Sequence, residues 1–194
     1  MNRSIFFILV ALFTASLFGQ NITGTLGPGG AFIIRDGSND FLSLSQTTGD
    51  LSLYRGLILP YSSSSTVGVI YKSGNRFIHD FGTGNTFVGL NSGNFEMTGI
   101  NNSSLGIGTL PLNTTGSENT AIGKSALNEN TTGSYNTAVG SVSLTKNTIG
   151  AANTGCGIGS LYSNTEGSNN SAFGNVALYN NTTGFENSAF GTYS

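Results

Sequence analysis

Few residues of this chain could do acid–base chemistry, and their spacing does not bring them together. The sequence holds 7 Lys plus Arg, 9 Asp plus Glu and 1 His. Glu118 and Glu186 occupy equivalent positions of a repeat, but they lie four repeats apart. Stacked repeats would separate them by roughly 19 Å, too far for a glycosidase pair. His79 and Asp80 are neighbours, so a strand points them to opposite faces. The sequence therefore predicts no catalytic residues and a protein that is not an enzyme.

Metal, cofactor and nucleic-acid binding are not indicated either. Cys156 and His79 are too distant in sequence to form a ligand motif, and the repeats contain no Asp, which calcium-binding rolls require. The glycines of Gly106–Gly108 and Gly155–Gly159 lack the lysine that follows in a phosphate-binding loop. No basic cluster is present to contact nucleic acid. We therefore expect no metal, cofactor or nucleic-acid partner, and we interpret Cys156 as a small apolar filler.

The residues that recur at fixed spacing are structural. A 17-residue unit begins at Gly82 and recurs without insertion or deletion to Ser194, inside the seventh copy. Such a short, strict period is typical of repeat folds in which each unit stacks on its neighbours. One asparagine column is invariant: Asn85, Asn102, Asn119, Asn136, Asn153, Asn170 and Asn187.

Two apolar columns predict the buried rows of the stack. The first column is Val88, Leu105, Ile122, Val139, Cys156, Phe173 and Phe190. The second column is Leu110, Leu127, Leu144, Leu161 and Leu178. Glycine and asparagine accept left-handed backbone angles and so suit the corners of a coil, whereas two glycines with Asn and Thr in every unit disfavour a helix. The sequence predicts an all-β fold, a β-solenoid with like residues stacked about 4.8 Å apart.

The thinness of each coil argues for association. A unit offers about two large apolar side chains, at roughly 2 kcal/mol each, against about 1–2 kcal/mol of entropy for every ordered residue. A homotrimer that shares a central core would supply the missing burial. If both apolar columns are buried, Ile122→Asp and Leu127→Asp should each unfold the repeats, and Glu118→Ala should change little.

The first 19 residues have the layout of a secretory signal peptide. Arg3 precedes an apolar run that begins at Ile5, and small residues precede a cleavage site expected between Ser16 and Gln20. The alternative is an uncleaved membrane anchor, but the run is shorter than the roughly 20 residues that a span needs. We expect a secreted or cell-surface protein.

Residues 20–81 lack the 17-residue register and predict a small N-terminal β cap or adaptor that covers the first coil. Val67–Tyr71 and Arg76–Asp80 predict a hairpin with a glycine in its turn. Pro60 and residues 62–65 mark a loop. Other strands are expected at Phe41–Leu44, Leu51–Tyr54, Leu57–Leu59 and Phe77–Ile78.

The repeats resemble a known group of bacterial fibres. The Asn-Thr-Ala-Ile-Gly sequence of Asn119–Gly123, repeated with Val at Asn136–Gly140, resembles the signature of head repeats in trimeric autotransporter adhesins. With Asn130–Gly133 and Val69–His79, the pattern is more similar to secreted tail-fibre-like proteins, which often end in a self-cleaving intramolecular chaperone. The resemblance covers residues 67–194 and implies a left-handed parallel β-roll in a trimer.

Two departures limit what the resemblance implies. The adhesin unit is shorter than 17 residues, and neither a membrane-anchor barrel nor a chaperone domain is present up to Ser194, so the chain could be a fragment of a longer protein. The resemblance carries over no catalytic residue.

Together these patterns predict a secreted or cell-surface structural and adhesive fibre that assembles as a trimer. One alternative is a carbohydrate-binding or polysaccharide-cleaving spike, since neutral polar residues beside tyrosines suit contacts with surface glycans or host matrix. The larger of these groups are Tyr135, Tyr162 and Tyr179. Another is an ice-binding solenoid, which needs rows of Thr-x-Thr. Serines interrupt the threonine column at Ser103, Ser171 and Ser188.

Overall fold

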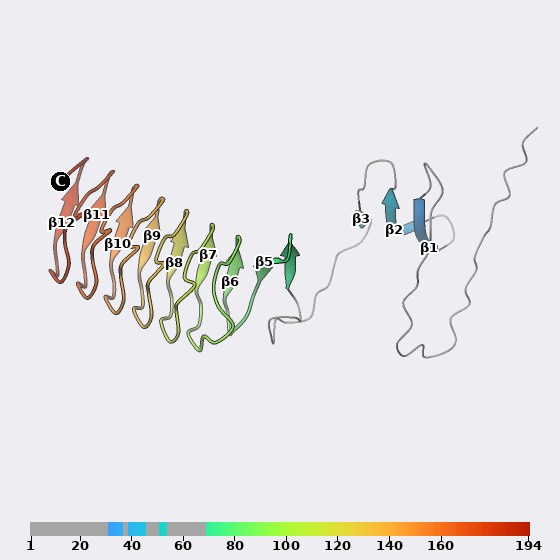
Figure 1. Cartoon of the computed structure of the whole chain (residues 1–194), viewed down its shortest axis with the longest axis horizontal. Helices are drawn as coiled ribbons and strands as arrows, with labels where there is room; N and C mark the ends of the chain where they lie inside the picture. The colour runs from blue at the N-terminus through green and yellow to red at the C-terminus, as the bar shows by residue number, and fades with distance from the viewer. Residues whose placement is uncertain (1–30, 37–38, 46–50, 54–68) are drawn as a thin grey trace, which may run out of the picture. The chain divides into compact units, whose positions relative to one another are not determined.

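The computed structural model describes residues 31–36, 39–45, 51–53 and 69–194, and these residues form strands and turns without a helix. The described strands belong to two sheets, which fall in separate units of the chain (Figure 1). The expected signal peptide, the strand at Leu57–Leu59 and the loop after Pro60 lie outside the described residues.

The first unit contains a three-stranded antiparallel sheet. Its strands are β1 (Ala31–Asp36), β2 (Asn39–Ser45) and β3 (Leu51–Leu53), in that order. The expected strand at Phe41–Leu44 lies within β2, and β3 covers most of the one expected at Leu51–Tyr54. Sequence reasoning missed β1, although its Phe-Ile-Ile run is rich in strand-forming residues.

The second unit begins with the expected hairpin. Strand β4 (Ile70–Lys72) pairs antiparallel with β5 (Asn75–His79). Ser73 and Gly74 connect the strands with φ angles of 50° and 77°. Two consecutive left-handed residues match the twist of a two-residue hairpin, which explains the position of the glycine. The hairpin joins the repeats directly, because β5 also pairs antiparallel with β6.

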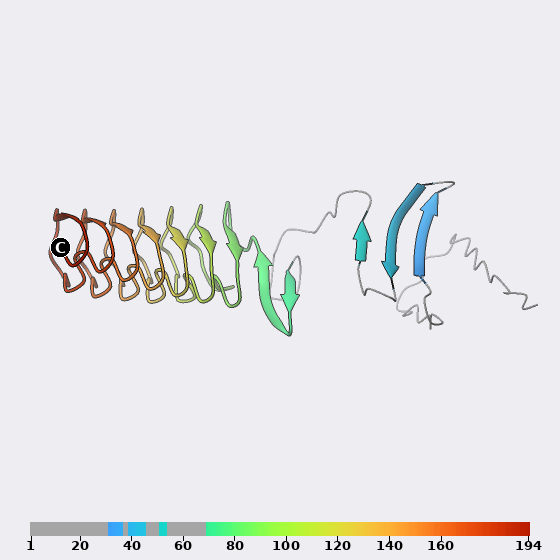
Figure 2. The same cartoon turned by 90° about the horizontal axis from the view of Figure 1, so that it is seen from above.

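Each repeat then contributes one three-residue strand, and consecutive strands pair in parallel. Ala121 lies opposite Ala138, for example, and every pair in the stack is offset by 17 residues. Figures 1 and 2 show the strands aligned along one side of the stacked coils. The chain is therefore a β-solenoid, as predicted. The strands are β6 (Thr86–Val88), β7 (Ser103–Leu105), β8 (Thr120–Ile122), β9 (Thr137–Val139), β10 (Thr154–Cys156), β11 (Ser171–Phe173) and β12 (Ser188–Phe190).

The corners of the coil differ from the expectation. Glycine does take a left-handed angle just after each strand, as at Gly123 with φ 119°. The invariant asparagines, such as Asn119, are not among the residues with positive φ. Instead, Glu118, Ser125 and Leu127 have positive φ angles of 56°, 57° and 51°. The backbone of a coil therefore turns at residues that do not favour this conformation, so the packing of their side chains must hold them there.

From the second unit onward, the glycine that opens a unit is required by crowding rather than by its backbone angle. A Cβ atom at Gly116 would lie 2.3 Å from the carbonyl oxygen of Gly133 in the next coil and 2.4 Å from Oδ1 of Asn113. No side chain fits in that space. Neighbouring coils therefore approach so closely at this corner that only glycine is accommodated.

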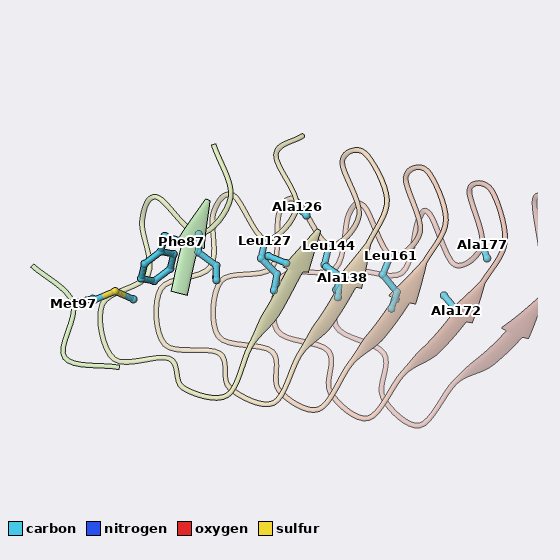
Figure 3. Close-up of a cluster of buried hydrophobic side chains, with 11 residues drawn as sticks. Phe87, Met97, Ala126, Leu127, Ala138, Leu144, Leu161, Ala172 and Ala177 are labelled. Carbon is cyan, nitrogen blue, oxygen red and sulfur yellow. The ribbon is translucent and has the colours of Figure 1, made fainter. Parts of the chain in front are cut away.

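The core is a narrow column inside the coils (Figure 3). In the third repeat Leu127 and the small Ala121 are both fully buried. In the first repeat the large and the small residue exchange positions: Phe87 takes the place of the alanine, and Gly93 takes the place of the leucine. A Cβ atom at Gly93 would lie 2.7 Å from the Phe87 ring. The exchange keeps the filled volume nearly constant, as close packing requires.

Candidate functional surface

The invariant asparagines form a hydrogen-bonded ladder inside the coils, which we call the first Asn ladder. The amide nitrogen Nδ2 of Asn119 donates to Oδ1 of Asn102 in the preceding coil at 3.0 Å and to the carbonyl oxygen of Gly133 at 2.9 Å. Its own Oδ1 accepts from the backbone and side-chain nitrogens of Asn136 at 3.0 and 3.2 Å. The pattern repeats from Asn85 to Asn187, so these predicted ladder residues do stack in register.

A second Asn ladder was not singled out from the sequence. Nδ2 of Asn130 donates to Oδ1 of Asn113 at 2.8 Å and to the carbonyl oxygen of Gly133 at 2.9 Å. The signal was present in the Asn-Thr-Thr-Gly ending of the units, which sequence reasoning interpreted only as a corner. The members of this ladder are Asn113, Asn130, Asn147, Asn164 and Asn181.

The leucine column is buried, as predicted. Leu110, Leu127, Leu144 and Leu161 are fully buried, and Leu178 in the sixth repeat is partly buried. All five have φ angles close to 50°. A leucine with positive φ is uncommon, and here the burial of its side chain in the coil offsets the backbone strain.

The other apolar column is not buried, so that prediction was wrong. Its residues stack in register on β6–β12, but their side chains point out of the coil, and we call this column the apolar ladder. Leu105 is 54% exposed, Ile122 39%, Phe173 39% and Phe190 72%. Cys156 is also exposed, and Val88 and Val139 are half-buried. Alternate residues of a strand face opposite sides, and the thin coil accepts only the small middle residue, such as Ala121.

The apolar ladder lies on an uncharged face. Two residues before it, on the same side of each strand, runs a column of hydroxyl side chains that we call the hydroxyl ladder. Its members are Thr86, Ser103, Thr120, Thr137, Thr154, Ser171 and Ser188. None of the fourteen positions of the two ladders holds a charged residue. The face alternates hydroxyl and apolar residues, so it has no rows of Thr-x-Thr of the kind expected for ice binding.

The acidic residues do not gather. Glu118 and Glu186 are exposed in separate coils, and the described residues contain no group of three His, Cys, Asp or Glu that could hold a metal ion.

The imidazole of His79 is a buried part of the junction between hairpin and coils. His79 is 3% exposed, and its ring contacts the rings of Phe87 and Phe95, with centroids 4.8 and 4.7 Å away. Nε2 is 2.8 Å from the carbonyl oxygen of Ser92, and the backbone N–H of Phe81 donates to Nδ1 at 3.4 Å. These partners suit a neutral ring that carries its proton on Nε2.

Burial is the largest influence on the pKa of His79 and lowers it. The hydrogen bond to Ser92 opposes that effect, the charge of Arg76 adds to it, and the charge of Asp80 opposes it. The arrangement is that of a structural histidine held neutral in a core.

Tyrosines form a surface stack of their own. The rings of Tyr162 and Tyr179 lie 4.9 Å apart and nearly parallel, and Nζ of Lys146 lies 5.2 Å from the Tyr162 ring centre. One face of each ring is therefore covered by the other ring. Tyr135 is 61% exposed and has no such ring neighbour among the described aromatic pairs.

A groove is found at the last coil. Its lining includes Val176, Leu178, Tyr179, Asn187 and Tyr193. The equivalent residues of earlier coils lie under the coil that follows, as the full burial of Leu161 shows. The groove is therefore the stacking surface of a coil and differs from an enclosed ligand cavity.

The residues that sequence reasoning selected thus form three ladders, two facing inward and one facing outward. These define a β-solenoid repeat protein whose outstanding surface feature is a straight, uncharged apolar face. No protein family, curated protein or solved structure matches the chain. No helix in the described ranges is long and apolar enough to cross a membrane.

Proposed function

We propose that the protein is a structural and adhesive fibre component, secreted or displayed at the cell surface, that assembles as a homotrimer. The observation that carries the proposal is the exposed apolar ladder. Isolated exposed apolar residues are common on soluble proteins, but a continuous apolar row marks a surface that another molecule covers. Covering the row with further copies of the chain explains why it recurs in every coil.

The free energy that burying the apolar ladder would contribute supports association. Inside the coils, the buried apolar side chains from the second repeat onward are one leucine per coil and small alanines. Fully burying a Leu, Ile or Phe side chain stabilises by about 1.5–3 kcal/mol. Leu105, Ile122, Phe173 and Phe190 are 39–72% exposed. Their burial between copies would contribute about 4 kcal/mol per chain, which is comparable with the total stability of many small domains.

The test is the solution mass of the secreted chain by light scattering, with circular dichroism on the same sample. We expect a trimer rich in β-structure. A folded, β-rich monomer would refute the assembly and would favour a single-chain binding protein instead.

Export is tested by the mass of the chain recovered from the medium of a secreting bacterium. Cleavage between Ser16 and Gln20 should shorten the chain by the length of the signal peptide. Recovery only in the membrane fraction, at full length, would instead support an uncleaved anchor.

The adhesive part of the proposal rests on the neutral polar surface outside the apolar ladder. Exposed Tyr135 has a free ring, which is the kind of group that packs against sugar rings. A glycan array should therefore show binding without turnover. Tyr135→Ala should reduce this binding more than Tyr162→Ala does, because the Tyr162 ring is already stacked on Tyr179. Release of oligosaccharide would favour the polysaccharide-cleaving alternative.

A further inference from the structure

We infer that the apolar ladder is the contact between copies, and that the copies lie parallel and in register, so that Cys156 of each chain meets Cys156 of the others. The inference rests on the proposed trimer, whose copies cover the apolar ladder, and adds the direction and the register of its assembly. Three observations support it, namely exposure, absence of charge and straightness, and the symmetry of a closed trimer then fixes the register.

Exposure and charge select this face over the others. The apolar ladder continues through every strand from β6 to β12, and the hydroxyl ladder beside it is also uncharged. Other exposed apolar residues, such as Ile149 and Phe185, lie in columns interrupted by polar residues, among them Glu166 and Ser168. Interfaces between identical copies are depleted of charge at their centre. The ladder face meets that condition along its whole length.

The ladder is also straight and long enough for a partner of the same shape. Figure 2 shows the strands that carry it in line along the stack. Six steps of about 4.8 Å give a row of roughly 29 Å. A second copy offers a matching row with the same spacing, because both rows have the repeat distance of a β-sheet. An unrelated globular partner has no reason to match this spacing over so many steps.

Symmetry then fixes the register. In a closed threefold assembly whose axis runs along the stack, rotation keeps each residue at its own height, so like residues meet around the axis. Phe173 of one copy then packs near Phe173 of the other copies, and Cys156 packs near Cys156 of the other copies. A twofold pair with antiparallel ladders, centred on Val139, would instead place Cys156 opposite Ile122. The single cysteine of the chain therefore reports which arrangement forms.

The test uses this native thiol and needs no substitution. The secreted full chain is treated with a trifunctional maleimide, in which each arm forms a thioether with one thiol and releases nothing. A parallel trimer should yield a three-chain product on a denaturing gel. The matched control moves the only cysteine to a charged, exposed position with Cys156→Ser and Glu129→Cys, and this variant should stay uncoupled.

A second variant pair tests the face independently. Ile122→Asp should convert the trimer to a monomer with unchanged β-structure, whereas Ile149→Asp, which is off the ladder and more exposed (52% against 39%), should remain trimeric. A trimer in which Cys156 does not couple, or which survives Ile122→Asp, would overturn this interface and leave the proposed trimer standing. A monomer for the unsubstituted chain would overturn both.

Discussion

Asn119→Ala tests whether the buried amides hold the coils together. The substitution removes four side-chain hydrogen bonds, two donated by Nδ2 to Asn102 and Gly133 and two accepted by Oδ1 from Asn136. Three of the four partner groups keep another bond. Oδ1 of Asn102 still accepts from the Asn119 backbone, the Gly133 oxygen from Asn130, and Nδ2 of Asn136 still donates to Gly150. The backbone N–H of Asn136 is left buried without its acceptor.

The expected cost follows from that count. Each hydrogen bond contributes about 0.5–1.5 kcal/mol net, and a buried group left without a partner costs about 1–3 kcal/mol. Because most partners keep one bond, we expect Asn119→Ala to lower the free energy of unfolding by about 3–5 kcal/mol. That loss is a large fraction of the stability of a domain.

The chain provides a matched control at the end of the same ladder. Asn187 is half-buried and its Nδ2 donates to Asn170 at 3.0 Å and weakly to Asn181 at 3.5 Å, but no described residue donates to its Oδ1. Asn187→Ala should therefore cost about 1 kcal/mol or less. Urea unfolding followed by circular dichroism measures both, at one fixed protein concentration because association adds to apparent stability. Equal losses for the two variants would refute the ladder as the source of the effect.

Three further predictions follow from burial, charge and crowding. Leu127→Asp should unfold the coils, because the Leu127 side chain is fully buried. Ile122→Asp should keep the dichroism spectrum and lose only association. Equal thermal melts for the two variants would contradict the placement of Leu127 inside the coil and Ile122 outside it. Stability should fall as the pH drops below about 6.5, the usual His pKa, toward the lowered pKa of His79 in the fold, since the unfolded ring takes up a proton that the buried ring resists. This dependence should weaken in His79→Gln, and an unchanged pH profile would assign it elsewhere. Gly140→Ala should lower the melting temperature far more than Gly74→Ala. A Cβ at Gly140 would lie 2.4 Å from a backbone oxygen of the next coil, whereas a Cβ at Gly74 would have no atom within 4 Å. Similar losses for the two variants would mean that the coils are not so closely stacked.

The period was enough to predict the solenoid and its register, since identical spacing in every unit leaves one way to stack it. It was harder to predict which residues of each strand face the interior of the coil. Hydrophobicity alone places Ile122 inside, but an interior already filled by Leu127 leaves room only for Ala121. The clue was the size of the middle column, which stays small from the second repeat onward, while the outer column varies from Cys to Phe. A crowded position restricts size, and an exposed one does not.

Backbone angles were beyond reach of the sequence. Leu127 adopts a φ of 51°, which no propensity scale assigns to leucine. The coil reaches this angle because the geometry of all neighbouring coils imposes it together. The second Asn ladder was missed for a related reason, since Asn at a corner and Asn in a ladder look identical until the coils are stacked.

This solenoid buries many amides beside its leucines and exposes a row of large apolar side chains, and this arrangement is the basis of the proposed assembly. The coil interior is rich in amides, and the amides of the two Asn ladders hydrogen-bond to like amides in adjacent coils. Coils therefore stabilise one another along the stack, and a lone coil has no satisfied core. The large apolar side chains that are displaced to the surface can be buried only by another molecule. In the proposed trimer, amides would drive stacking along the axis and apolar side chains would drive association across it, so we expect substitutions to separate the two processes.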